Sequence, residues 1–144
     1  MGRLVAAALA AVVVGAMAAE AGPQPQRRKW WQDDKLKAEI GLTDQQSAEV
    51  EEVFQGAIPK LRSLKQQLDT LEADLSRLIR ERTAEEQLVA AQIDRVEATR
   101  AELSKTRTLM LYRIHRLLSP EQNARLQAVY DRQKDRGRDS RRPQ

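Results

Sequence analysis

Apolar residues recur along the middle of the chain at alternating spacings of four and three. The series reads Val50, Phe54, Ala57, Leu61, Leu64, Leu68, Leu71, Leu75 and Leu78. This heptad spacing predicts one long α-helix over about 43–82. The helix cannot bury such a stripe against itself, so an element of comparable length, from this chain or a second copy, must lie along it. Pro59 interrupts the stripe and predicts a bend, in preference to a break, near residues 55–58.

A second apolar series of matching length lies downstream. It predicts a returning helix over about 84–117, whose stripe contains Val89, Ile93, Val96, Leu103, Met110, Ile114 and Leu117. The sequence at 83–86 fits a capping box, so we expect the turn just before it. Arg100 and Arg107 occupy two positions of the stripe and should extend past its edge or face an open surface. The short connection predicts an antiparallel helical hairpin.

A short helix is predicted before the hairpin. Residues 30–40 fit such a helix, and Gly41 is well placed as its C′ residue. The adjacent Trp30 and Trp31 point in different directions on a helix. We therefore expect one of them to pack against the body and the other to be available to a partner.

Another short helix is predicted after the hairpin. Ser119 fits its N-cap, Pro120 its first position and Gln122 its N3 position, and the apolar pattern fades near residue 135. The predicted fold is all-α: a long antiparallel helical hairpin with short flanking helices.

The first 21 residues have the pattern of a secretory signal peptide. Arg3 supplies a positive charge, residues 4–19 form an uncharged run rich in Ala and Val, and small residues then fit a cleavage pattern. The alternative is an N-terminal membrane anchor, but a span needs about 20 apolar residues and this run is shorter. We therefore expect export, cleavage of the signal peptide and a periplasmic location.

The remaining chain divides by composition. Residues 22–29 are rich in Pro, Gln and basic side chains and are predicted to be a flexible linker. Residues 30–136 contain the periodic segments and are predicted to form one helical domain. Residues 137–144 are basic and lack apolar side chains, which predicts a disordered tail.

Composition argues against several classes of function. The 25 basic and 21 acidic residues give a net charge of +4, but the two signs are interleaved, which favours solvated helix faces over a nucleic-acid surface. Without cysteine the chain has neither disulfides nor thiolate metal sites. No nucleophile, phosphate loop or acid–base pair stands out, and we expect the acidic pairs Glu51–Glu52 and Glu85–Glu86 on exposed helix faces. The sequence predicts neither an enzyme nor a need for a cofactor.

Two copies of one short motif open helices on either side of the hairpin. The first copy, Leu-Thr-Asp-Gln-Gln, contains Leu42, Thr43 and Gln46, and the second, Leu-Ser-Pro-Glu-Gln, contains Leu118, Ser119, Pro120 and Gln122. With the signal peptide, the hairpin and the absence of cysteine, this pair resembles the LTxxQ family of bacterial periplasmic proteins. That family includes the stress proteins Spy and CpxP and related periplasmic heavy-metal sensor and resistance proteins.

The resemblance implies a hooked hairpin that dimerises into a thin, curved cradle. In the chaperone branch of the family, the concave face binds unfolded clients through apolar patches ringed by basic side chains. The corresponding candidates are Arg62, Lys65, Arg100 and Arg107. The implied partners are a second copy of the chain and unfolded envelope proteins or a membrane sensor protein. Long helices with few aromatic residues also bury little surface as a monomer, which favours a dimer.

The sensor branch of the family suggests an alternative function, the binding of divalent metal ions. That branch is implied to use several His residues with Glu and Met, whereas here His115 is the only histidine, and Met110 lies five positions away on another side of the helix. A site of His115 with carboxylates such as Glu49 or Glu52, or with the His115 of a second copy, would be weak and poorly selective. We therefore favour His115 as a packed or interface residue and client binding as the function.

Overall fold

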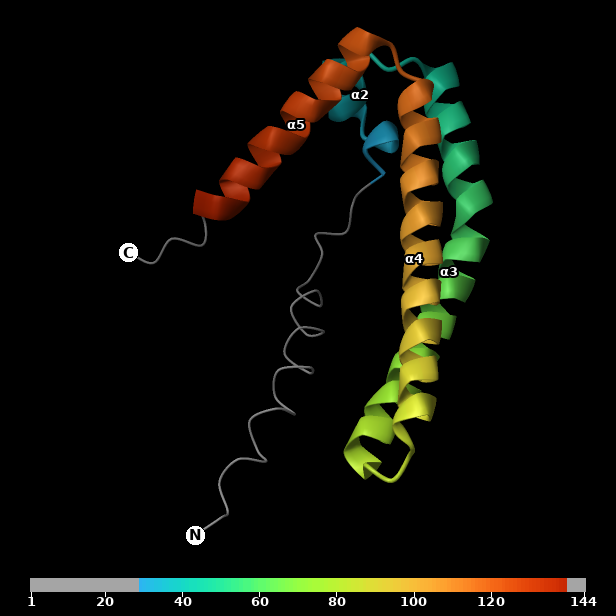
Figure 1. Ribbon diagram of the computed structural model, residues 1–144. Helices are drawn as coiled ribbons and strands as arrows, with labels where there is room; N and C mark the ends of the chain where they lie inside the picture. Colours follow the sequence, from blue (N-terminus) through green and yellow to red (C-terminus); the bar gives the residue numbers. More distant parts are fainter. Residues whose placement is uncertain (1–28, 140–144) are drawn as a thin grey trace.

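The computed structural model describes residues 29–139, which form four α-helices and one short 3₁₀ turn without any strand (Figure 1). The elements are η1 (Trp30–Gln32), α2 (Asp34–Ile40), α3 (Asp44–Glu81), α4 (Glu86–Arg116) and α5 (Pro120–Asp139). The predicted all-α fold is confirmed. The proposed signal peptide at 1–21 lies outside the described residues, as do residues 22–28 of the linker and 140–144 of the tail.

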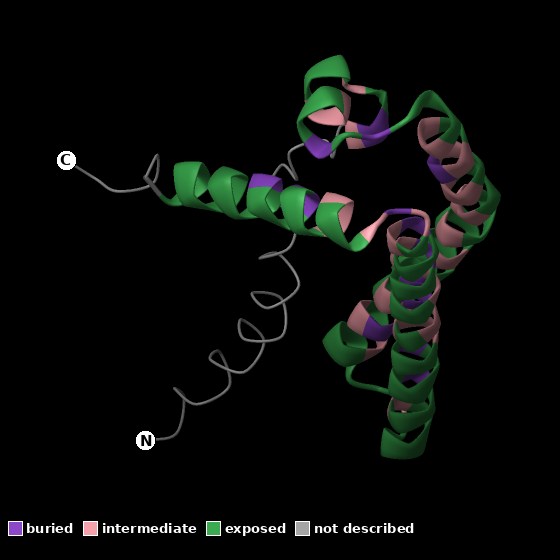
Figure 2. Ribbon diagram, turned by 90° about the horizontal axis from the view of Figure 1, so that it is seen from above, coloured by how far each residue is buried: buried purple, intermediate pink, exposed green. Residues whose placement is uncertain are grey.

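Helices α3 and α4 form the predicted antiparallel hairpin. Along most of its length the seam is closed by a cluster of buried aliphatic residues that come from both apolar stripes: Leu68, Leu71, Leu75, Val96 and Leu103. Figure 2 shows the buried positions along the line where the two helices meet, with exposed positions on their outer sides. The only buried polar side chain found in the described residues, Gln92, donates from its amide to the carbonyl oxygen of Leu71 at 3.0 Å. Its hydrogen-bonding requirement is thus met across the seam.

Helix α3 is continuous through Pro59. The structure therefore agrees with a single helix over this region and excludes a break into two. Figure 1 shows α3 curving along its length against α4. Because the apolar spacing continues through the proline, packing against α4 offsets the backbone hydrogen bond that the proline removes.

The predicted capping box at 83–86 is not formed. Helix α4 begins at Glu86, with Glu85 as an N-cap that makes no side-chain cap bond. The reason lies in the preceding helix, whose C-cap Arg82 adopts the left-handed conformation at φ 56° and donates its N–H to the carbonyl oxygen of Leu78 at 3.1 Å. The residues that follow Arg82 are needed to reverse the direction of the chain. Thr83 therefore lies within the turn and cannot serve as the N-cap of α4.

The single helix predicted over 30–40 is wrong in one respect. It is divided into η1 and α2 by Asp33, whose carboxylate accepts hydrogen bonds from the backbone N–H groups of Lys35 and Leu36 at 3.0 and 3.2 Å. An N-cap of this kind requires an extended backbone, which ends the first turn and begins a new helix. Gly41 has the left-handed φ of 77° expected of a C′ glycine.

A second buried cluster joins the short helices to the end of the hairpin. It contains Trp31, Ile40, Leu42, Val50, Met110, Ile114, Leu118 and Leu126. Figure 1 shows the result: α5 turns back from the end of α4, and the chain forms a hook. Trp31 is buried in this cluster. Trp30 is half-buried, and its ring meets that of Trp31 edge to face, with 5.6 Å between the two ring centres.

Helix α5 is longer than the sequence predicted. It continues through residues 137–139, which are part of the predicted disordered tail, and ends at Asp139 instead of near residue 135. The segment has no apolar residues, but Arg, Gln and Lys are good helix formers and no proline interrupts it before residue 143. Residues 131–138 are exposed, so this half of α5 projects from the body, which it contacts through the ion pair between Arg132 and Glu39 (Figure 2).

Candidate functional site

The two Leu-[Ser/Thr]-x-x-Gln motifs meet at the bend of the hook. In the first, the Thr43 hydroxyl accepts from the Gln46 N–H at 3.1 Å, and the Gln46 amide oxygen accepts from the Thr43 N–H at 3.1 Å. In the second, the Ser119 hydroxyl accepts from the Gln122 N–H at 3.1 Å, and the Gln122 amide oxygen accepts from the Ser119 N–H at 2.9 Å. Both motifs thus form capping boxes, at the starts of α3 and α5.

The side chains of Gln46 and Gln122 also pair with each other across 76 residues of sequence. Each amide nitrogen donates to the amide oxygen of the other at 2.9 Å. Gln46 donates further to the carbonyl oxygen of Leu117 at 3.0 Å, and Gln122 to that of Gly41 at 2.7 Å. Each glutamine therefore caps its own helix and bonds the backbone just before the other motif. We call this arrangement the glutamine clasp.

The leucines of the two motifs lie beneath the clasp. Leu42 and Leu118 are both buried, and both belong to the cluster that joins α2, α5 and the hairpin. Pro120 is exposed at the first position of α5, where its missing N–H costs no helical hydrogen bond. The motif thus has three roles: the leucine packs, the Ser or Thr caps, and the glutamine links the two motifs. Because the linked helices are α3 and α5, the clasp fixes the direction of the hook.

A second polar cluster, which the sequence did not reveal, attaches η1 to α3. The Glu51 carboxylate, expected on an exposed face, accepts from Lys29 Nζ at 2.6 Å, Trp31 Nε1 at 2.7 Å and Gln55 Nε2 at 2.7 Å. These donors, led by Lys29 and Gln55, lower the pKa of Glu51 to about 2. Lys29, assigned to the flexible linker, also lies 5.1 Å from the ring centre of Phe54. The sequence did not reveal this cluster because two of its donors, Lys29 and Trp31, lie about 20 residues before Glu51.

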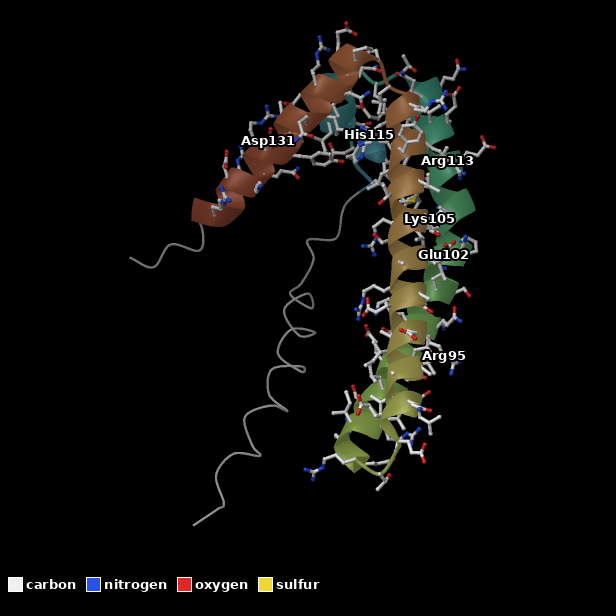
Figure 3. The ribbon with its side chains drawn as sticks, viewed as in Figure 1. Arg95, Glu102, Lys105, Arg113, His115 and Asp131 are labelled. Atoms are coloured by element: carbon white, nitrogen blue, oxygen red, sulfur yellow. The ribbon has the colours of Figure 1, made fainter. Side chains whose placement is uncertain are left out.

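His115 is engaged with α5. Its Nδ1 lies 2.7 Å from Oδ1 of Asn123, and the Asn123 amide donates to the carbonyl oxygen of His115 at 3.0 Å. Figure 3 shows His115 on the side of α4 toward α5. Within residues 29–139, no group of three or more His, Cys, Asp or Glu side chains is placed to hold a metal ion. The contacts of His115 therefore join two helices.

The side of the hairpin toward η1 and α5 is the inner face of the hook. On α3, Glu51 marks this side because it binds η1, and Ile58 and Lys65 follow it at spacings of seven, which keeps them on the same side. Arg62 belongs to it as well, since it lines one shallow depression together with Lys65 and Leu61.

Helix α4 contributes the other two basic candidates to the inner face. Glu72 continues the Glu51 series by another seven residues, and its carboxylate accepts from Arg100 Nη2 at 2.6 Å. Arg107 follows Arg100 by seven residues. The structure therefore places all four predicted cations on one side of the hairpin.

The four cations differ in their partners. Arg100 pairs with Glu72 and Glu97, and the bond to Glu72 in particular raises its pKa. Lys65 pairs with Asp69 one turn away. Arg62 and Arg107 are exposed and take part in none of the ion pairs found within residues 29–139. These two charges are consequently available to a ligand.

These features define a class of protein: a hooked, all-α hairpin whose two Leu-[Ser/Thr]-x-x-Gln motifs clasp each other. Residues 4–125 match the sequence model of the heavy-metal resistance family, so the chain belongs to that family. The resemblance to the LTxxQ periplasmic family is confirmed at this level, and members are typically periplasmic. No curated protein and no solved structure matches the chain. None of the helices between residues 29 and 139 has the length and apolar character that a membrane span requires.

Proposed function

We propose that the protein is an exported, non-enzymatic binding protein that holds unfolded envelope proteins on the inner face of its hook. The main support for this proposal is the mixture of basic and apolar side chains on that face. The exposed, unpaired Arg62 and Arg107 stand beside the half-buried Leu61 and Leu111, and Ile93 is 42% exposed further along α4. Unfolded chains offer both apolar and acidic side chains, which this mixture fits without selecting one sequence.

We further propose that the protein acts as a homodimer. A thin hairpin leaves large apolar side chains exposed near its tip, among them Ile79 at 40% and Leu88 at 62% exposure. A second copy would cover such residues and enclose a longer inner face. Sedimentation of the processed chain should give twice the monomer mass, and a monomer at micromolar concentration would refute the dimer.

The client-binding proposal is tested by suppression of aggregation of a chemically unfolded client. The double variant Arg62→Glu/Arg107→Glu reverses the two free charges of the inner face. We expect the concentration needed for half-suppression to rise about tenfold, which corresponds to about 1.4 kcal/mol. The matched control, Arg136→Glu/Arg138→Glu, reverses two exposed charges on α5 and should change it by less than about twofold. Equal activity of both variants, or no suppression by the unmodified chain, would refute the proposal.

A second candidate function is the binding of divalent metal ions, which the description of the family favours. His115 would be the first ligand, with Glu49 or Glu52 or the partner copy supplying the others. Calorimetric titration with zinc, nickel and copper, repeated on His115→Ala, tests it. Micromolar binding that disappears in the variant would favour metal binding as the function of the protein. The absence of binding by the unmodified chain would remove this candidate.

A further inference from the structure

From Leu103 to its end, α4 carries cations but no acidic side chain. Between residues 103 and 118 the chain has no Asp or Glu, and its cations are Lys105, Arg107, Arg113 and Arg116. Elsewhere in the described residues many cations are paired, as Lys60 is with Glu102 and Arg132 is with Glu39. None of the four cations in this half of α4 takes part in any of the ion pairs found within residues 29–139.

Three of these cations lie on one stripe with two exposed apolar side chains. Lys105, Leu109, Tyr112 and Arg116 follow one another at spacings of four, three and four, and Arg113 adjoins them. Tyr112 is 58% and Leu109 41% exposed. The Arg116 guanidinium lies 5.9 Å from the ring centre of Tyr112. We call these five residues the outer stripe.

The outer stripe points away from the hairpin seam. Tyr112 lies two residues from both Met110 and Ile114, which are buried in the seam, and two residues turn a helix by about 200°. In Figure 3, Arg113 lies on the other side of α4 from His115, which faces α5. The stripe is therefore separate from the inner face and forms no part of the client site proposed above.

We propose that the outer stripe docks the protein on an anionic phospholipid bilayer. Cations flanking an exposed tyrosine and leucine along one helix face match the interfacial region of a membrane, where phosphates lie above the acyl chains. Tyrosine is favoured there because its ring is apolar and its hydroxyl remains hydrated. The acidic residues at the same end of α3, Glu49 and Glu52, make no ion pair with the stripe.

The first test is co-sedimentation of the processed chain with vesicles of phosphatidylcholine, with and without phosphatidylglycerol. We expect binding to the anionic vesicles alone, weakening as salt is added. The variant Lys105→Glu/Arg113→Glu/Arg116→Glu should reduce partitioning at least about tenfold. Its matched control, Lys134→Glu/Arg136→Glu/Arg138→Glu, reverses three exposed charges on α5 that lack apolar neighbours and should reduce it less than about threefold. Far-UV circular dichroism verifies that both variants are folded.

The second test locates the contact. The chain has no cysteine, so a single introduced cysteine can carry an environment-sensitive fluorophore. Ala98→Cys places it seven residues before Lys105, on the same side of α4 as the outer stripe, and Ala48→Cys places it on the exposed side of α3. Anionic vesicles should shift the emission of the first label to the blue and leave that of the second unchanged.

The proposal would be overturned by equal binding to neutral and anionic vesicles, by equal loss of binding in both charge variants, or by equal shifts of both labels. A change of oligomeric state in the outer-stripe variant, with vesicle binding intact, would instead make the stripe an interface between copies. Binding of inorganic phosphate by the protein, without any binding to vesicles, would also refute docking on a bilayer. None of these results bears on aggregation suppression by the inner face.

Discussion

The glutamine clasp yields the sharpest prediction, because its two halves can be removed separately. Gln122→Met keeps the length of the side chain but deletes four hydrogen bonds: two with Gln46, one to the carbonyl of Gly41 and one from the N–H of Ser119. At about 1 kcal/mol each, reduced where water can replace the lost partner, the free energy of unfolding should fall by roughly 2–4 kcal/mol. Gln46→Met should cost a similar amount.

The double variant distinguishes a clasp from two independent caps. The two bonds between the amides are lost in either single variant, and each single variant also leaves the other glutamine without partners. The double variant should therefore cost about 1–2 kcal/mol less than the sum of the singles. Independent capping boxes would add to within about 0.5 kcal/mol.

The assay is urea unfolding followed by far-UV circular dichroism, at one fixed protein concentration because association shifts apparent stability. Gln45→Met is the matched control, since Gln45 is exposed on the same turn and its amide bonds only Glu49 at 3.0 Å. It should change stability by less than about 0.5 kcal/mol. Additive single variants, or a control as costly as Gln46→Met, would show that the amide pair does not stabilise the hook.

Three further predictions concern the ends of the hook and the long helix. Leu126→Ala, at a side chain only 1% exposed, should lower the free energy of unfolding by about 2–5 kcal/mol in the same urea assay. Because the pKa of Glu51 is lowered, its hydrogen bonds stabilise η1 fully above the ordinary carboxyl pKa of 4.5 and are lost as the pH falls toward 2. Tryptophan emission should shift to the red over this pH range as Trp31 is released. Glu51→Gln should remove this transition, whereas Glu49→Gln should retain it. Pro59→Ala should raise the midpoint of thermal unfolding, since it restores a backbone hydrogen bond in an exposed part of α3. An unchanged or lower midpoint would show that the curvature of α3 is needed for its packing against α4.

Local signals in the sequence were sufficient to place most helix ends. Thr43 with Gln46, and Ser119 with Gln122, cap helices through bonds that span three residues, so no knowledge of the fold is required. The same local reasoning failed at Thr83. There the geometry of the chain reversal, and not the capping sequence, decides where α4 begins.

The sequence by itself determined the helices, the two apolar stripes and the family, because periodicity and capping depend on neighbours within one or two turns. Only the tertiary structure decided which glutamine meets which, that Glu51 binds the N-terminal turn, and that the cations of the long hairpin divide between an inner face and an outer stripe. Those contacts join residues from about 20 to 76 positions apart. They form because the burial of both apolar stripes, and of the cluster around Leu42 and Leu118, fixes how the helices lie against one another. Local sequence patterns do not reveal this arrangement, because it depends on the free energy of packing between distant segments.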